Sequence, residues 1–172
     1  GRIVRDKGIN ELVEAFVLLL KKYPNLKLLL VGDYDDNLNR IDDETKDLIS
    51  SMESIINVGF KSDIRDFLSI SDLFVLPSYR EGLPNSLIEA GSFGIPLLAT
   101  NINGCNEIID NKETGLLIKM KDINSLKDGM EKYITDEKFY LNIKKKIRDS
   151  IIKKYNQTQF WNNLINEFNK IN

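Results

Sequence analysis

The sequence predicts an α/β domain in which a parallel β-sheet is covered by helices on both faces. Helix-like and strand-like segments alternate along most of the 172 residues, which is the order typical of a parallel sheet. The strand-like segments are almost continuously apolar, as expected for strands that are buried on both faces. With 42% hydrophobic residues, a chain of this length can bury one full core, so we expect one domain.

Short apolar runs that stop at glycine, proline or a polar residue predict five strands. They cover residues 26–31, 55–58, 73–76, 96–100 and 115–118. Gly32, Gly59 and the turn 77–84 directly follow the first three of these strands. Because parallel sheets bind ligands at the carboxyl ends of their strands, these three positions predict a binding edge.

The helices are predicted from helical spacing of apolar residues and from residues that start or stop a helix. Residues 9–22 repeat apolar side chains at intervals of three and four and end before Pro24. Ser62 predicts the N-cap of a helix that reaches Ile70. The remaining helices are expected at 42–52, 85–93, 106–110, 123–135, 137–154 and 158–171.

Both ends of the chain carry features that suggest a missing domain. Residues 1–4 resemble the end of a strand and the loop after it, so we expect an excised part of a longer protein. The helix predicted at 158–171 is amphipathic and includes Trp161 and Phe168. We expect its apolar side chains to pack into the core, and docking on another domain is the alternative.

Composition excludes several kinds of chemistry. The chain has no histidine, which excludes a Ser-His-Asp triad and a His-rich zinc site within it. Its one cysteine, Cys105, excludes an internal disulfide, makes the cytoplasm the simplest compartment and is expected to be passive. A net charge of -2 indicates no bulk attraction to nucleic acid or membranes. The lysine run 144–146 is interpreted as a solvated helix face, with a lipid or nucleic-acid patch as the alternative.

Two carboxylates flank a turn and the helix start after it. Glu81 lies in the loop after a predicted buried strand, and Glu89 lies about one turn into the next helix. Their spacing alone carries no weight, and complementing the helix dipole is an equally good explanation for Glu89. However, Gly82 allows close approach of backbone, Asn85 or Ser86 can cap the helix, and free amides at a helix start suit a diphosphate. Because carboxylates accept hydrogen bonds from sugar hydroxyls, this stretch points to a nucleotide-sugar site.

Two cations flank the first loop of the chain. Arg2 and Lys7 bracket a loop that ends at Gly8, just before the first helix. Arginine binds phosphate as a planar fork and lysine as a point charge. The competing interpretation, that both are ordinary solvated cations, is the commoner case for lysine and arginine in general.

Four motifs, in order, resemble the carboxyl-terminal domain of the retaining GT-B glycosyltransferases called glycosyl transferases group 1. They are GRIVRDKG at 1–8, LLVG at 29–32, SDLFVLPS at 71–78 leading into Glu81 to Glu89, and GIPLLAT at 94–100 followed by Gly104, 107–109 and 114–117. The resemblance covers essentially the whole chain, although Asp6 stands where a glutamate is commoner. It implies a Rossmann-like fold with extra C-terminal helices, and a donor-binding domain over 1–172 whose N-terminal acceptor domain is absent.

The resemblance also implies a role for each candidate residue. Arg2 and Lys7 would neutralise the diphosphate of the donor in place of a metal, so no metal or other cofactor is expected. The rest of the donor would be bound in three parts: the ribose by Glu89, the hexose by Glu81 with the amides of Gly82 and Leu83, and the nucleobase beside Gly59, Phe60 and Lys61. Amides at the helix start, among Asn85, Ser86 and Leu87, would bind the diphosphate.

The function implied by the resemblance is retaining transfer of a hexose from a nucleotide diphosphate sugar to a glycan or lipid-linked acceptor. We expect a role in surface polysaccharide biosynthesis, a cytoplasmic location, and peripheral contact of the full-length enzyme with the inner face of the membrane, with no nucleic-acid partner. The excised chain alone is expected to bind donor weakly and to transfer no sugar. The alternatives are a non-catalytic nucleotide-binding or regulatory α/β domain, a GT-B nucleotide-sugar epimerase or a phosphorylase.

Overall fold

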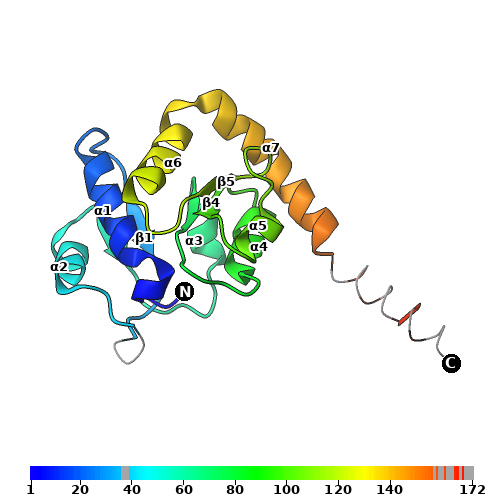
Figure 1. Cartoon of the computed structure of the whole chain (residues 1–172), viewed down its shortest axis with the longest axis horizontal. Helices are drawn as coiled ribbons and strands as arrows, with labels where there is room; N and C mark the ends of the chain where they lie inside the picture. Colours follow the sequence, from blue (N-terminus) through cyan, green and yellow to red (C-terminus); the bar gives the residue numbers. More distant parts are fainter. Residues whose placement is uncertain (36–38, 157, 159–160, 162–164, 167, 169–172) are drawn as a thin grey trace.

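The computed structural model describes residues 1–35, 39–156, 158, 161, 165–166 and 168. Helices and strands alternate in the predicted order (Figure 1). The strands are β1 (Leu28–Leu30), β2 (Ile55–Asn57), β3 (Phe74–Leu76), β4 (Leu97–Thr100) and β5 (Leu116–Ile118). The helices are the 3-10 turn η1 (Arg5–Lys7), α1 (Ile9–Leu20), α2 (Asp43–Ser51), α3 (Arg65–Ser69), α4 (Asn85–Ser92), α5 (Cys105–Ile108), α6 (Ile123–Thr135) and α7 (Glu137–Lys154).

All five strands pair in parallel, but in two groups and not in one continuous ladder. β1 pairs with β2, and β4 pairs with β3 on one side and β5 on the other. At the carboxyl ends of β1 and β3, residues 1–8 contact both groups. Ile3 N donates to Asp33 O at 2.8 Å, and Tyr79 N donates to Asp6 O at 2.8 Å. The N-terminal segment therefore joins the two groups just beyond the ends of their strands.

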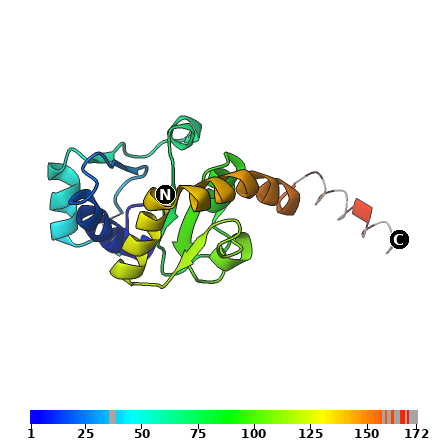
Figure 2. The same cartoon turned by 90° about the horizontal axis from the view of Figure 1, so that it is seen from above.

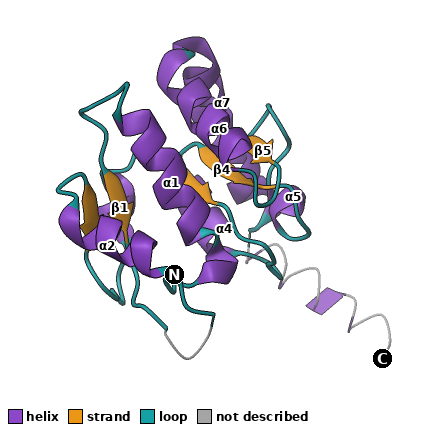
Figure 3. Cartoon of the chain, turned by 60° about the vertical axis from the view of Figure 1, so that its left-hand side comes forward, coloured by secondary structure: helices purple, strands orange, loops and turns teal. Residues whose placement is uncertain are grey.

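Strand β4 shows that helices cover both faces of the sheet. The side chain of Leu98 belongs to a core cluster with residues of α1 and α6, such as Val13 and Leu126. Its neighbour Leu97 belongs to a second cluster with residues of α4, α5 and α7, such as Ile147. Because successive strand side chains point to opposite faces, this alternation confirms the predicted α/β architecture (Figures 2 and 3).

The predicted helix caps are wrong. Ser62 does not cap α3, which begins at Arg65. The backbone amide of Arg65 donates instead to Asp63 Oδ1 at 3.0 Å. Neither Asn85 nor Ser86 caps α4, because both lie inside its first turn and no side chain caps the helix. The strands are also shorter than predicted, since apolar residues continue into the flanking loops.

Most of the helix predicted at 158–171 lies outside the described residues. Three of its apolar side chains are described, and all are more than half exposed: Trp161, Ile165 and Phe168. The expectation that they pack into the core is therefore wrong. The core cluster around Leu97 is already covered by α4, α5 and α7. None of the described helices is long and apolar enough to cross a bilayer.

Candidate functional site

The loop before α1 and the loop after β3 are packed together at the carboxyl edge of the sheet. Gly8 has a left-handed φ of 69°, and a Cβ atom built there would lie 2.2 Å from the carbonyl oxygen of Pro77. Only glycine fits such an approach without displacing the backbone. The backbone bond from Tyr79 to Asp6 fixes the same junction. As a result, the first basic loop and the acidic loop face each other although they are far apart in the sequence.

Lys7 and Glu81 form an ion pair across this junction. Lys7 Nζ lies 2.6 Å from Glu81 Oε1, and the two side chains are 30% and 11% exposed. The resemblance assigned these residues to different parts of a donor, the diphosphate and the hexose, and the structure brings them into direct contact. A partly buried pair of this kind is less screened than a surface pair. The site therefore holds one cation and one carboxylate at fixed positions.

The loop before α5 lies directly beneath the acidic loop. Gly104 has a φ of 83°, and a Cβ atom built on it would lie 1.8 Å from Gly82 O. The next residue, Cys105, is fully buried. Burial and, less strongly, the charge of Glu81 raise the pKa of the Cys105 thiol to about 12, and the charge of Lys7 offsets part of this rise. The thiol thus lies beside the ion pair and stays protonated, in agreement with the predicted passive role.

A pocket of about 440 Å³ lies between the N-terminal segment and the loops after β1 and β2. Of the predicted site residues, Arg2, Phe60 and Lys61 line it. Phe60 N donates to Asp33 Oδ1 at 2.9 Å, which ties the two loops together. The Phe60 side chain is 69% exposed, so its ring is available to a planar ligand. Arg2 Nη1 lies 3.2 Å from Asp35 Oδ2 at the same pocket.

Gly59 lies behind this pocket and does not line it. Its carbonyl accepts a hydrogen bond from Gly32 N at 2.9 Å, and its own amide donates to Asn57 Oδ1 at 3.2 Å. A φ of 70° makes Gly59 the point at which the chain turns after β2. The residue therefore shapes the pocket through its backbone, by holding Phe60 and Lys61 at the pocket wall.

The start of α4 offers fewer free amides than predicted. Leu87 N already donates to Pro84 O at 2.9 Å, and the Leu87 side chain is fully buried. The Leu87 amide closes the first helical turn in this conformation, and a diphosphate contact through Leu87 stays a prediction. Among the described residues, no group accepts a hydrogen bond from the amides of Asn85 or Ser86. These two amides remain available to an anion.

Glu89 is exposed on α4 and lies near the pocket. The pKa of the Gly1 amino group is lowered by burial and by the charge of Lys7, and it is raised by the charge of Glu89. Since Gly1 lines the pocket, both charges lie within electrostatic range of the pocket wall. Gly82 and Leu83, in contrast, are exposed in the turn beside Glu81 and do not line the pocket. The predicted residues therefore form two adjoining parts, the pocket and the Lys7–Glu81 pair.

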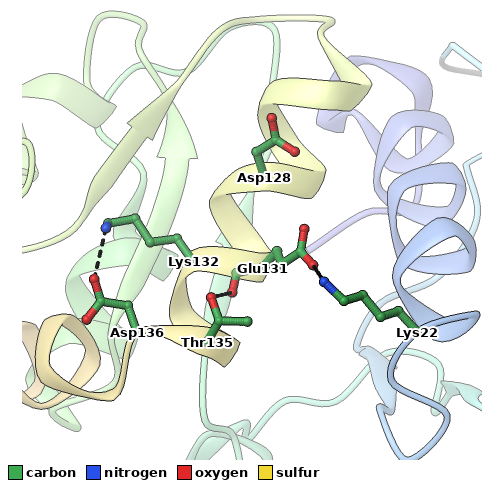
Figure 4. Close-up of a pocket in the computed structure, with 6 residues that line it drawn as sticks. All are labelled: Lys22, Asp128, Glu131, Lys132, Thr135 and Asp136. Carbon is green, nitrogen blue, oxygen red and sulfur yellow. Dashed lines mark hydrogen bonds and ion pairs between the residues drawn. The ribbon is translucent and has the colours of Figure 1, made fainter.

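A second pocket, of about 450 Å³, lies between the end of α1 and α6 (Figure 4). Four of its charged side chains are paired with each other: Lys22 with Glu131 at 2.7 Å and Lys132 with Asp136 at 3.1 Å. Because Gly8 at the start of α1 contacts the carboxyl edge, Lys22 beyond the other end of α1 lies about 18 Å away along the helix. This pocket is therefore remote from the predicted site residues.

Several residues of the site were not predicted. Asp33, Tyr34 and Ile64 complete the pocket wall. The Gly32–Asp33 pair directly after the first strand was a usable signal, because polar residues at strand ends face the ligand edge. Nothing in the local sequence indicates that Cys105 lies beside Lys7. No group of three or more Asp, Glu or Cys side chains suited to a metal occurs in the described part of the chain.

Comparison with known proteins identifies the family. The family pattern described as glycosyl transferases group 1 matches residues 1–150. The capsular polysaccharide biosynthesis glycosyltransferase CapM of Staphylococcus aureus is 31% identical over 98% of this chain and 44% of its own length. An Escherichia coli UDP-Gal:alpha-D-GlcNAc-diphosphoundecaprenol alpha-1,3-galactosyltransferase is 32% identical over 91% of this chain and 40% of its own length.

A solved structure agrees with these relatives. The crystal structure of the C-terminal domain of the glycosyl transferase group 1 family protein LpcC from Francisella tularensis superposes with a TM-score of 0.81. It is 28% identical in sequence, and the match covers 90% of this chain and 83% of that one. The chain spans less than half the length of the two curated relatives. The chain belongs to the glycosyl transferases group 1 family.

Proposed function

We propose that residues 1–172 form the donor-binding domain of a retaining glycosyltransferase. The enzyme would transfer a hexose from a nucleotide diphosphate sugar to a glycan or lipid-linked acceptor during surface polysaccharide biosynthesis. The observation that carries this proposal is the Lys7–Glu81 pair. The charge of Lys7 acts on Gly1 in the wall of the pocket of about 440 Å³, and Glu81 lies a few residues before the free amides of α4. Two relatives support it: CapM is named for capsular polysaccharide biosynthesis, and the galactosyltransferase is named for a UDP-Gal donor and a diphosphoundecaprenol-linked acceptor.

The donor would extend from the pocket to the ion pair. The nucleobase would lie against the exposed ring of Phe60 and beside Lys61. Glu89 would accept hydrogen bonds from the ribose hydroxyls, as an ionised carboxylate can accept several. The hexose would contact Glu81 and the exposed backbone of Gly82 and Leu83.

The diphosphate would lie between the two cations and the α4 amides. Arg2 keeps donors to spare after pairing with Asp35, because a guanidinium carries five N–H groups and the contact between Nη1 and Asp35 Oδ2 uses one. Lys7 has three N–H donors and uses one on Glu81. When the bond between the anomeric carbon and the diphosphate oxygen breaks, the leaving group keeps the electron pair. Fixed cations and backbone amides would stabilise that developing charge.

The acceptor would bind to a further, N-terminal domain of the longer protein. The chain covers 44% and 40% of the two relatives, which leaves room for such a domain in proteins of their length. We propose a cytoplasmic enzyme that works at the inner face of the membrane, since one relative is named for an undecaprenol-linked acceptor. The 172-residue chain alone would bind donor and transfer no sugar.

The test is calorimetric titration of the chain with UDP-, GDP- and ADP-linked hexoses and with the free nucleotides. Glu89→Ala should weaken every ligand that carries a ribose, by about tenfold for the loss of a charged hydrogen bond. Glu81→Ala should weaken only the sugar-linked forms, because the free nucleotide does not reach Glu81. If both variants bind all ligands as the wild type does, the assignment of the acidic pair is wrong.

A further inference from the structure

Helix α7 concentrates the basic residues of an otherwise acidic chain. It contains seven Lys or Arg and two Asp or Glu. The rest of the chain contains 17 Lys or Arg and 24 Asp or Glu. The helix lies along the outside of the domain (Figure 1). Charge separation on this scale creates a local potential that differs in sign from that of the whole molecule. The net charge of -2 therefore hides a basic surface.

One face of α7 is fixed to the domain. Ile143, Ile147 and Ile151 are buried at four-residue intervals. A Cβ atom built on Gly91 of α4 would lie 2.7 Å from Ile151 Cγ1, so the two helices are in close contact there. The opposite face of α7 is thereby held outward in one orientation, which makes it a rigid surface.

The outward face carries two cations between two aliphatic side chains. Leu141, Lys145, Arg148 and Ile152 follow at intervals of four, three and four, so they form one stripe about 16 Å long. Leu141 is 54% exposed and Ile152 is 48% exposed. No carboxylate among the described residues forms a salt bridge with Lys145 or Arg148 within 4.0 Å.

The flanking lysines differ from this stripe because they bind back to the domain. Lys146 Nζ lies 2.6 Å from Glu113 Oε2, and Lys154 donates to the carbonyl of Glu107. The lysines of the run 144–146 thus do not act as a unit. Charge available to a partner is concentrated on the stripe and on its exposed neighbours Lys138, Lys144 and Lys153, since Lys144 bonds only to the neutral Tyr140 hydroxyl of the same helix.

We propose that the α7 stripe is a docking surface for an anionic lipid membrane. Clustered cations on a helix are attracted to anionic head groups, and exposed aliphatic side chains insert between lipids. Duplex nucleic acid is anionic like such a membrane, but it offers no apolar region to receive the side chains of Leu141 and Ile152. The surface is independent of the donor site, although the lipid-linked acceptor of the proposed function would make a membrane the available partner.

Vesicle sedimentation tests this surface. The wild-type chain should sediment with vesicles of phosphatidylcholine containing about one third phosphatidylglycerol, and less with pure phosphatidylcholine, at low ionic strength. The double variant K145Q/R148Q should lower the partition coefficient by about ten- to thirtyfold, since each cation near the surface contributes about fivefold. The control K21Q/K27Q removes the same charge from exposed positions outside α7. It should change the partition coefficient by less than about twofold.

Three results would overturn the proposal: no sedimentation with the anionic vesicles, equal losses in the two double variants, or binding to duplex DNA that equals vesicle binding and shows the same losses. Circular dichroism of both double variants excludes unfolding as the cause, because all four positions are exposed. The state of the donor site does not affect this assay, so its failure would leave the proposed donor binding and sugar transfer untouched.

Discussion

The contact between Gly104 and Gly82 makes a specific prediction about how the acidic loop is held. Replacing Gly104 by alanine places a Cβ atom 1.8 Å from Gly82 O, where an ordinary contact begins at 3.4 Å. The two loops must therefore separate by about 1.6 Å, the difference between these distances. A φ of 83° adds backbone strain of about 1–2 kcal/mol, and forced repacking adds about 1–3 kcal/mol.

Gly94→Ala is a matched control for this substitution. Gly94 also has a positive φ, 77°, but the nearest atom to its built Cβ is Arg148 Cβ at 4.0 Å. It therefore suffers the backbone strain without the collision. Urea unfolding should show a loss of about 3 kcal/mol for Gly104→Ala and of about 1 kcal/mol for Gly94→Ala.

Donor binding separates the two variants further. Gly104→Ala should weaken a UDP-hexose about tenfold, because the displaced loop carries Glu81 and Gly82. The same variant should change the affinity for free UDP little, and Gly94→Ala should change neither. Equal stability of the two variants, or unchanged UDP-hexose binding by Gly104→Ala, would refute the role given to this contact.

Three further predictions concern the ion pair, the pocket and the thiol. Lys7→Met leaves Glu81 mostly buried without its cation. A double-mutant cycle with Glu81→Gln, measured by urea unfolding, should therefore give a coupling free energy of about 1 kcal/mol. A coupling free energy near zero would contradict the pairing. Asp33→Ala removes the acceptor for Phe60 N and should weaken nucleotides about fivefold by calorimetry, whereas Asp33→Asn keeps an acceptor oxygen and should bind as the wild type does. Burial raises the pKa of Cys105 from 9.0 to about 12. As the pH rises, the thiol of the unfolded chain therefore loses its proton first, and the free energy of unfolding falls above pH 9. Cys105→Ala should reduce that fall in urea titrations at alkaline pH, and an unchanged pH dependence would contradict this prediction.

The order of the elements could be predicted because local signals and the fold agree. The continuous apolar runs around Leu98 and Val75 are needed on both faces of the sheet, so their pattern indicates strands directly. Helix caps could not be predicted in the same way. Ser62 and Asn85 are good capping residues by type. However, α3 begins three residues after Ser62, and α4 begins at Asn85 itself.

The site could be predicted in its composition and not in its contacts. The glycines and carboxylates that follow the strands lie at one edge of the sheet, as predicted from the fold, because parallel strands all end there. The Lys7–Glu81 pair joins residues 74 positions apart, and no local pattern reports a contact over that distance. The use of the Leu87 amide inside α4 depends on the exact first turn, which sequence periodicity does not resolve.

A nucleotide that binds at the carboxyl edge of the sheet should shift the amide signals of that edge when the ¹⁵N-labelled chain is titrated with UDP-hexose. We predict the largest shifts at Gly59, Phe60 and Ser86, with Lys22 and Glu131 in the second pocket unchanged (Figure 4). Shifts concentrated at Lys22 and Glu131, or no shifts with any nucleotide sugar, would contradict the account.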